Sequence, residues 1–465
     1  MMRSMFSAVS GLKAHQLRMD VIGNNIANVN TVGFKGSRVT FQEVFSQTLR
    51  GGGAPQAGRG GTNPQQVGLG IDVASMDTFH IRGAVETTDY NTDLMINGDG
   101  FFIVSDDAAF LNRSYTRAGS FTIDEEGNLN TPDGMRVLGY MYNPETERMG
   151  TTLEGLQVSR GITFPANSTG VPITEDGEEG TVIPEGVKFD GNLNADVKPC
   201  TEEIEIVDGV GPRLDDLKDE DGKSAIARDT TFTVYDELGG SHEVRLAFVK
   251  TEKNEYTLYI VDKDRIADVP ANESPHVIEF DSNGKIKSEE DSDGDASPIM
   301  TLSISPKDGD LLPNGARGFT FKIDFSELTQ FDNESDASAY YISGYKQGGL
   351  LDFAVDSNGV ITGYFSNGQM RPIGQVALAN FRNPAGLEKT GNNLYRTSPN
   401  SGEPMIGYPG TGGRGALNPG ALEMSNVDLS REFTNMITTQ RGFQANSRII
   451  TTSDEMLQEV VNMKR

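Results

Sequence analysis

The chain has 465 residues, with 40 Lys and Arg against 67 Asp and Glu, so its net charge of −27 would repel nucleic-acid phosphates and anionic lipid headgroups. One hydrophobic core does not fill a chain of this length, so we expect two to four domains. The longest apolar runs fall far short of the ~20 residues that cross a bilayer, so we expect neither nucleic-acid binding nor membrane insertion.

The first predicted element is an amphipathic helix that begins near Met5. Its apolar residues recur at steps of three, four or seven, which places them on one helical face that only His15 interrupts. The helix should end near residues 30–33, because Gly33 can adopt the left-handed conformation of a helix C-terminus. The face consists of Met5, Ala8, Leu12, Met19, Ile22, Ile26 and Val29.

Short strands and tight turns follow this helix. Residues 93–104, 115–130 and 135–140 alternate apolar runs with Gly, Asn and Asp turns, and the turn sequence DSNG recurs at Asp281 and Asp356. Residues 230–261 predict further strands, which we assign to a separate β-domain inserted into the first.

The middle of the chain offers little chemistry. Asp291, Asp293 and Asp295 resemble a calcium loop, but Ala296 replaces the required Gly and Leu302 stands where the closing carboxylate should be. No Walker loop, zinc-protease motif or nucleophile elbow is present. We therefore expect no enzyme, no cofactor and no metal site.

A second amphipathic helix closes the chain. Ser425 and Asp428 have the spacing of a capping box, so this helix should begin near Asn426 and run almost to Arg465, about forty residues. Its apolar residues form two adjacent strips, which one neighbouring helix cannot cover. We weigh an intrachain helix pair alone against assembly with other copies and expect assembly. The residues are Phe433, Met436, Phe443, Ile449, Ile450, Met456, Leu457, Val460 and Val461, with Met463 beyond.

These elements predict a mainly β protein with long α-helical termini and nested, discontinuous domains. The glycine-rich segments 50–70 and 407–420 should be flexible connectors. We expect residues 1–49 with 421–465 to form a terminal, coiled-coil-like assembly domain. We expect a β-rich core domain from 71–145 with 340–406, and an outer β-domain from 146–339.

Four blocks of the sequence resemble the flagellar rod, hook and hook-associated protein family. They are residues 7–35, the segments GDGFFIV and YTRAGSF of the β body, and residues 425–465. Within that family, the chain length, the inserted domain and residues 364–402 resemble hook proteins more than the shorter rod proteins. A distal rod or hook-associated junction protein is the first alternative, and an extracellular binding or adhesin module the second.

The resemblance implies a non-enzymatic subunit that polymerises with itself into the flexible tube between rod and filament, where it transmits motor torque. It implies export of the unfolded chain through the flagellar type III apparatus, with a possible chaperone, and contacts with a distal rod protein, a hook–filament junction protein and a hook cap. The hook would be periplasmic in a spirochaete and extracellular otherwise. A net charge of −27 should make polymerisation easier when salt screens the repulsion.

The opening MMRSMF and the lone Cys200 resemble spirochaete hook proteins, whose subunits become joined through lysinoalanine. The resemblance implies that Cys200 loses its thiol and that a lysine of a neighbouring subunit adds to the residue that remains. We prefer Lys188 as this lysine, with Lys198 as the second choice. The alternative, a thiol that takes no part in crosslinking, stays open.

Overall fold

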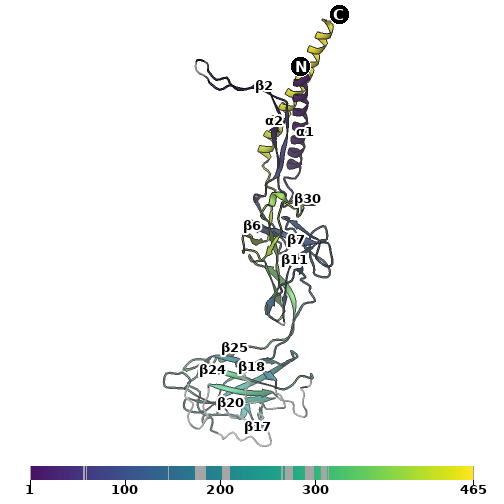
Figure 1. Cartoon of the computed structure of the whole chain (residues 1–465). Coiled ribbons are helices and arrows are strands. Elements are labelled where there is room, and N and C mark those ends of the chain that lie inside the picture. Colours follow the sequence, from purple (N-terminus) through teal and green to yellow (C-terminus); the bar gives the residue numbers. More distant parts are fainter. Residues whose placement is uncertain are drawn as a thin grey trace. The chain divides into compact units, whose positions relative to one another are not determined.

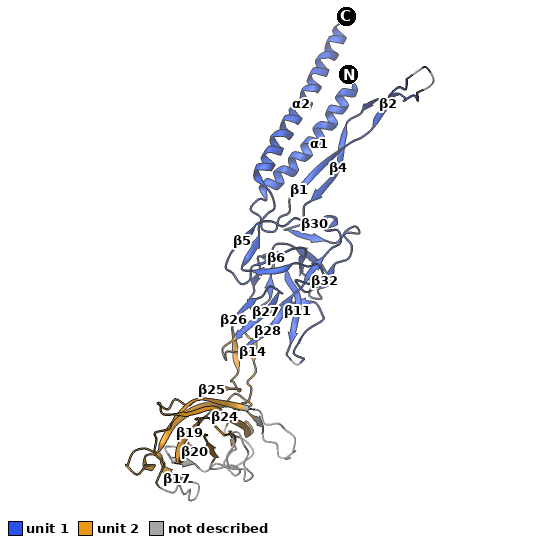
Figure 2. Cartoon of the chain, turned by 90° about the vertical axis from the view of Figure 1, so that its left-hand side faces the viewer, with its two compact units in different colours: residues 1–160, 351–364, 370–465 blue, residues 161–350, 365–369 orange. Residues whose placement is uncertain are grey.

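A computed structural model describes residues 2–463 apart from 56–57, 59, 145, 173–184, 202–209, 263–264, 268–275, 288–297, 305–311 and 313. The chain is mainly β, with one α-helix near each end, which confirms the predicted fold class. It divides into two compact units (Figure 2). Unit 1 comprises residues 1–160, 351–364 and 370–465, and unit 2 comprises residues 161–350 and 365–369. The finer division into assembly, core and outer domains stays a prediction.

The N-terminal helix α1 (Met2–Ala27) ends close to where the sequence predicted. The chain then turns, and Gly33 adopts a φ of 69°. A Cβ at Gly33 would lie 2.6 Å from the backbone nitrogen of Ala118, so both the conformation and the close approach require glycine here.

The C-terminal helix α2 (Leu429–Asn462) begins three residues later than predicted and has 34 residues. The predicted capping box is wrong, because the N-cap is Asp428, whose carboxylate accepts hydrogen bonds from the backbone nitrogens of Ser430 and Arg431. The Ser425 hydroxyl instead accepts a bond from the backbone nitrogen of Val427 at 3.4 Å.

Two antiparallel strand pairs follow α1; the first runs alongside this helix, and the second extends away from it (Figures 1 and 2). β1 (Ser37–Glu43) pairs with β4 (Ile71–Thr78), and β2 (Ser46–Arg50) pairs with β3 (Gln65–Gly68). One of the two segments expected to be connectors therefore contains β3. The other contains β33 (Ala416–Pro419), which pairs with β6 (Leu94–Asn97). A hinge role for these segments stays a prediction.

The β body of unit 1 is built around antiparallel strands whose central path runs β26-β27-β28-β11-β7-β8-β31-β30. Its core packs Phe101, Ile103, Tyr115 and Leu138 against Phe381 and Tyr395. The remaining strands of this unit attach to that path or form a separate pair of β34 with β5. The strands are β5 (Val85–Thr87), β7 (Phe101–Ser105), β8 (Arg113–Thr116), β9 (Thr122–Ile123), β10 (Leu129–Asn130), β11 (Arg136–Asn143), β12 (Arg148–Met149), β13 (Glu154–Gly155), β26 (Gly348–Val355), β27 (Val360–Phe365), β28 (Met370–Val376), β29 (Leu378–Asn380), β30 (Glu388–Gly391), β31 (Leu394–Arg396), β32 (Met405–Gly407) and β34 (Ala421–Glu423), with a 3-10 turn η2 (Pro384–Gly386).

Unit 2 contains two sheets that enclose one apolar core. The first has the order β15-β24-β16-β25, with β23 also on β24, and its β16 and β24 run parallel. The second has the order β17-β21-β20-β19-β18, with β22 also on β20. Alternate residues of β24 are buried, as expected for a strand with one face on a core. The elements are β14 (Thr163–Phe164), β15 (Val171–Pro172), β16 (Glu185–Asn194), β17 (Val210–Arg213), η1 (Leu214–Asp216), β18 (Ile226–Tyr235), β19 (Ser241–Glu252), β20 (Glu255–Asp262), β21 (Arg265–Ala267), β22 (His276–Glu279), β23 (Ile299–Ile304), β24 (Phe319–Phe331) and β25 (Ser338–Ile342).

Candidate assembly site

The two helices lie side by side in unit 1, and we call the line of contact between them the seam (Figures 1 and 2). Most of the residues that they bury are small. A Cβ at Gly11 would lie 2.8 Å from the Asn446 amide nitrogen, and a Cβ at Gly442 would lie 2.9 Å from the His15 ring. A larger residue at either glycine would therefore require the facing Asn446 or His15 side chain to move. The buried residues of the helices are Ala8, Gly11, Ala14, Ile22 and Asn25 of α1 and Thr439 and Ser453 of α2.

Because most of the buried helix residues are small, many large apolar side chains remain on the outside of the helix pair. Phe433 is 50% exposed and Val461 is 65% exposed. Such side chains gain the free energy of burial only when another surface covers them. Of the residues predicted to form the assembly surface, the exposed ones are Phe433, Phe443, Ile449, Met456, Val460 and Val461. The buried or half-buried ones are Met5, Leu12, Met19, Ile22, Ile26, Val29, Met436, Ile450 and Leu457.

Sequence reasoning missed further exposed apolar residues on both helices. Phe6 is 69% exposed and Ile437 is 52% exposed, although neither lies on the predicted apolar face. A count of apolar residues around the whole helix circumference could have found them, because the chosen spacing of three, four and seven follows one face alone. The missed residues are Met2, Phe6, Val9, Leu429 and Ile437.

A buried ion cluster connects the segment that follows α1 to the segment that precedes α2. We call this end of the helix pair, where α1 ends and α2 begins, the root. The Glu423 carboxylate lies 2.6 Å from the Lys35 amine and 3.4 Å from the Arg117 guanidinium, and all three side chains are almost completely buried. It also accepts a hydrogen bond from the backbone nitrogen of Gly83. Lys35 precedes β1 and Glu423 ends β34, so the cluster joins the segments that leave α1 and enter α2.

Two buried cations face one carboxylate in this cluster, and this excess of positive charge affects the pKa values of the groups nearby. Burial lowers the pKa of both Lys35 and Arg117, while the Glu423 charge opposes that shift. His80 stacks edge-on against Phe101 and Tyr395, and burial together with the nearby cations lowers its pKa to about 4. His80 is therefore neutral at physiological pH.

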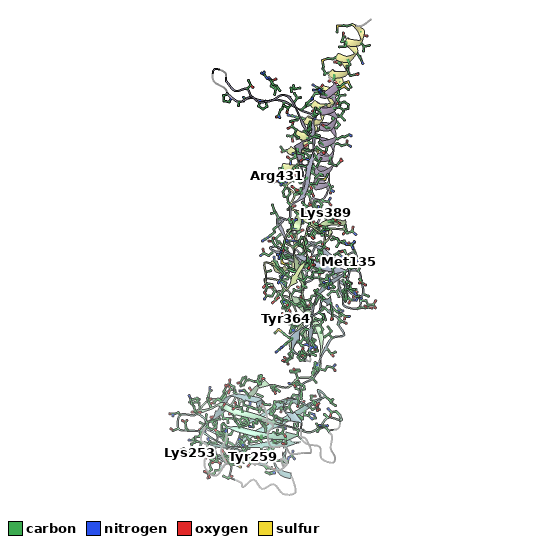
Figure 3. All side chains as sticks on the ribbon, in the orientation of Figure 1. Met135, Lys253, Tyr259, Tyr364, Lys389 and Arg431 are labelled. Atoms are coloured by element: carbon green, nitrogen blue, oxygen red, sulfur yellow. The ribbon has the colours of Figure 1, made fainter. Side chains whose placement is uncertain are left out.

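A crevice of ≈ 380 Å³ lies at the root, between α1, β1 and the start of α2. Arg18, Arg38 and Arg431 line it together with apolar side chains such as Val21 and Phe79. In Figure 3, Arg431 lies at the lower end of the helix pair, above Lys389 in the β body. We call this cavity the root crevice.

The residues of the predicted crosslink lie in unit 2. Cys200 is half-buried and packs against a small apolar cluster that includes Leu217 and Tyr259. Lys188 lies on β16, with its amine 3.8 Å from an Asp324 carboxylate oxygen. Lys198 forms an exposed ion pair with Asp221, which raises the lysine's pKa through a hydrogen bond and through charge. The crosslink from Cys200 to either lysine stays a prediction.

The acidic turn at Asp291, Asp293 and Asp295 lies outside the described residues. Within the part of the chain that the structure describes, no group of three His, Cys, Asp or Glu side chains is arranged to hold a metal ion. Neither α1 nor α2, as described, combines the length and apolar content that a membrane span requires.

Four flagellar families match separate parts of the chain. The flagella basal body rod protein family matches residues 5–35, and the flagellar hook protein FlgE/F/G D1 domain matches residues 95–179. The flagellar basal body protein FlaE D2 domain matches residues 210–345, and the flagellar basal body rod FlgEFG protein C-terminal family matches residues 418–463. The first and last of these contain the two terminal helices.

Full-length relatives are similar across the whole chain. The flagellar hook protein FlgE of Borreliella burgdorferi is 38% identical over 476 residues, with all of both chains covered. The flagellar hook protein FlgE of Treponema pallidum is also 38% identical, over 495 residues and with the same coverage. The flagellar basal-body rod protein FlgG of Bacillus subtilis is 30% identical over 466 residues, again with all of both chains covered.

Proposed function

The chain belongs to the flagellar hook protein family, and on this premise we propose that its terminal helix pair is the surface through which copies assemble into the hook. The observation that carries the proposal is the row of large apolar side chains left outside the helix seam. Phe6, Phe433 and Val461 are each at least half exposed in the single chain. Neighbouring helix pairs would cover these side chains and leave the seam within each subunit unchanged.

The mechanics of the hook follow from the different construction of helices and β body. Helix pairs packed on all sides would form a stiff inner layer, whereas units joined by a few chain crossings would move against their neighbours. We infer that the β-domains slide past their neighbours, so that each protofilament shortens and lengthens as the bent hook turns, with the glycine-rich segments 50–70 and 407–420 as hinges. The subunit's role in this motion is structural rather than enzymatic.

The same proposal extends to partners and location. A hook subunit would meet a distal rod protein at one end of the tube and a hook–filament junction protein at the other, with a hook cap present during assembly. The unfolded chain would pass through the flagellar type III apparatus, with a chaperone before export. The hook would stand in the periplasm of a spirochaete or outside the cell in other bacteria.

Substitution of exposed helix residues tests this assembly surface. The variant Phe433→Gln/Ile449→Gln/Val460→Gln should abolish sedimentable tubes, as seen by pelleting and negative-stain microscopy. Its circular dichroism should match the parent, because all three side chains are exposed in the single chain. Leu111→Gln is the matched control, since Leu111 is 79% exposed in the β body. Normal tubes from the triple variant would overturn the proposal.

We also propose that Cys200 forms a lysinoalanine bridge to Lys188 of a neighbouring subunit. A solvent base removes the Cα proton of Cys200, its sulfur leaves as hydrosulfide, and dehydroalanine results. The lysine amine then adds to the Cβ, and a proton returns to the Cα. A neutral amine is needed for this addition, and Asp221 raises the pKa of Lys198. We keep Lys188 as the preferred donor because it lies on strand β16, which fixes its position.

Mass spectrometry of assembled tubes tests the bridge. A peptide with Cys200 should be joined to one with Lys188, at a mass lower than their sum by one H₂S. Cys200→Ala and Lys188→Arg should each remove the joined peptide, whereas Lys198→Arg should keep it. A joined peptide that persists in Lys188→Arg and disappears in Lys198→Arg would assign the bridge to Lys198 instead.

A further inference from the structure

The end of α2 extends past the start of α1. Gly11 lies against Asn446 and His15 against Gly442, so the helices are antiparallel and facing residue numbers add to 457. This register places Met2 level with Glu455. The last two turns of α2 therefore continue beyond α1, as the positions of the chain ends in Figure 2 show. We call residues 454–463 the tip.

The tip is both acidic and apolar. Asp454, Glu455 and Glu459 are exposed, and the last two lie four residues apart on one side of the helix. Met456 and Val460 are 46% and 47% exposed beside them. None of the three carboxylates forms an ion pair with a residue that the structure describes. Lys464 and Arg465, the next charged residues, lie outside that part of the chain.

The root crevice has the opposite character. Arg18 and Arg431 form no ion pair within the described ranges, whereas Arg38 pairs with Asp77 at 3.3 Å. The two acids that line the crevice are engaged locally. Asp428 caps α2, and Glu432 accepts hydrogen bonds from the Asn25 and Asn435 side chains.

The crevice also offers apolar walls to an incoming helix. Val21 and Ile22 of α1, Val39 of β1, Phe79 and Val427 line it alongside the arginines. A ligand that fits would carry carboxylates next to apolar side chains, which is the combination found on the tip. Because arginine binds carboxylates in a planar, two-bonded arrangement, the pairing would also fix the orientation of the docked helix.

We propose that the tip of α2 from one copy of this chain docks into the root crevice of a second copy, with Glu455 paired to Arg431 and Arg18. This inference rests on the proposed self-assembly and names one contact within it. The 24 residues from Arg431 to Glu455 span roughly 36 Å of helix, so the second copy is shifted along the helix axis by about that distance.

A tip-to-root contact uses two different surfaces of the same subunit. Each copy can therefore accept one neighbour at its root and offer its tip to another. Head-to-tail contacts form a closed ring only if the rotation between neighbouring subunits returns the last subunit to the first, and otherwise they form an open filament. The proposed contact thus produces an open row of subunits, as the growth of a tube requires.

Reversal of the charge at Arg431 or Glu455 tests the proposed contact, and we expect both substitutions to leave helix α2 folded. Arg431→Glu places an acid at the third position of α2, and Glu455→Lys places a base in its last third. Both changes suit the helix dipole, so circular dichroism of the unassembled chains should match the parent. Arg448→Glu is the matched control, because Arg448 is exposed on α2 but belongs to neither the tip nor the root crevice.

The readout is the critical concentration for polymerisation of the full chain, measured by pelleting. Arg431→Glu and Glu455→Lys should each raise it about tenfold, and the double variant should restore it to within about threefold of the parent. Normal assembly of either single variant would overturn the contact, as would a double variant as defective as the two single effects combined. If the parent chain itself formed no tubes, the proposed function would fail instead.

Discussion

The two units carry very different charges. Unit 2 has 17 Lys and Arg against 40 Asp and Glu, a net charge of −23, whereas unit 1 has 23 against 27 and a net charge of −4. Their interiors also differ. Unit 2 encloses an apolar core between two sheets, whereas unit 1 buries the Lys35–Glu423–Arg117 cluster beside its apolar core.

Because of this difference, copies of the chain should attract one another through unit 1 and repel one another through unit 2. The nearly neutral unit holds both helices with their exposed apolar side chains, so copies can approach there at little electrostatic cost. The acidic unit repels its counterparts in other copies, and that repulsion falls as salt shortens the screening length to ~10 Å at 0.1 M. The two units can therefore be perturbed separately.

The largest expected effect is on the core of unit 2. Phe189 is fully buried and packs its ring against Phe232, Phe248 and Phe325. Phe189→Ala should lower the free energy of unfolding of unit 2 by about 4 kcal/mol. Hydrogen exchange should show faster exchange in β16 and β24, with α1 and α2 unchanged. Phe331→Ala is the control, because Phe331 is 53% exposed. Equal losses of protection in both units would mean that they unfold together.

A somewhat smaller effect should follow from Glu423→Gln in unit 1. This change leaves two buried cations without a carboxylate, and the amide keeps part of the hydrogen bonding, so we expect a loss of about 3 kcal/mol. Guanidinium unfolding, followed by hydrogen exchange of β1 and β34, measures it. The exposed pair of Lys198 and Asp221 supplies the comparison, because Lys198→Ala should cost under ~1 kcal/mol. Similar costs for the two variants would contradict a structural role for the buried cluster.

The pH dependence of unit 1 should come partly from His80. Its pKa falls from 6.5 to about 4 on folding, so the unfolded chain binds the proton more readily between these values. The free energy of unfolding of unit 1 therefore has its full value above about pH 6.5 and decreases as the pH falls toward 4. At pH 5 the decrease should be about 2 kcal/mol. Comparison of urea unfolding of the parent and His80→Phe across this range isolates the effect, because phenylalanine keeps the ring packing. Identical pH profiles would rule out His80 as the source.

The smallest effect should come from the removal of a few exposed acidic residues from unit 2. Asp215→Asn/Asp216→Asn/Glu237→Gln/Glu252→Gln removes four exposed acids and should lower the critical concentration by about twofold at low salt, with little change at high salt. The control removes four exposed acids from unit 1: Glu125, Asp133, Glu147 and Glu403. An equal shift from both sets would show that total charge matters and its location does not. Polymerisation of the parent that weakens steadily with added salt would contradict the repulsion altogether.

The sequence was sufficient for the fold class and for both helices, because their apolar periodicity and their flanking Gly and Asp residues are local signals. It did not reveal the seam, since Gly11 and Gly442 read as weak helix positions until the partner helix is seen across from them. It also missed the ion cluster. Lys35 and Glu423 are 388 residues apart, and nothing near either residue indicates burial. The predicted helix start was wrong because Ser425 and Asp428 are both favourable N-cap residues, and in the structure Asp428 is the N-cap.

The distance in sequence between Lys35 and Glu423 has a consequence for a chain that emerges from its amino end. The amine of Lys35 has no carboxylate to meet until residue 423 appears, after the whole of unit 2. Contacts of such long range form slowly, because a large loop must first close. A chain that has emerged only in part therefore cannot form this buried ion cluster, and the last tenth of the polypeptide determines when unit 1 can complete its fold.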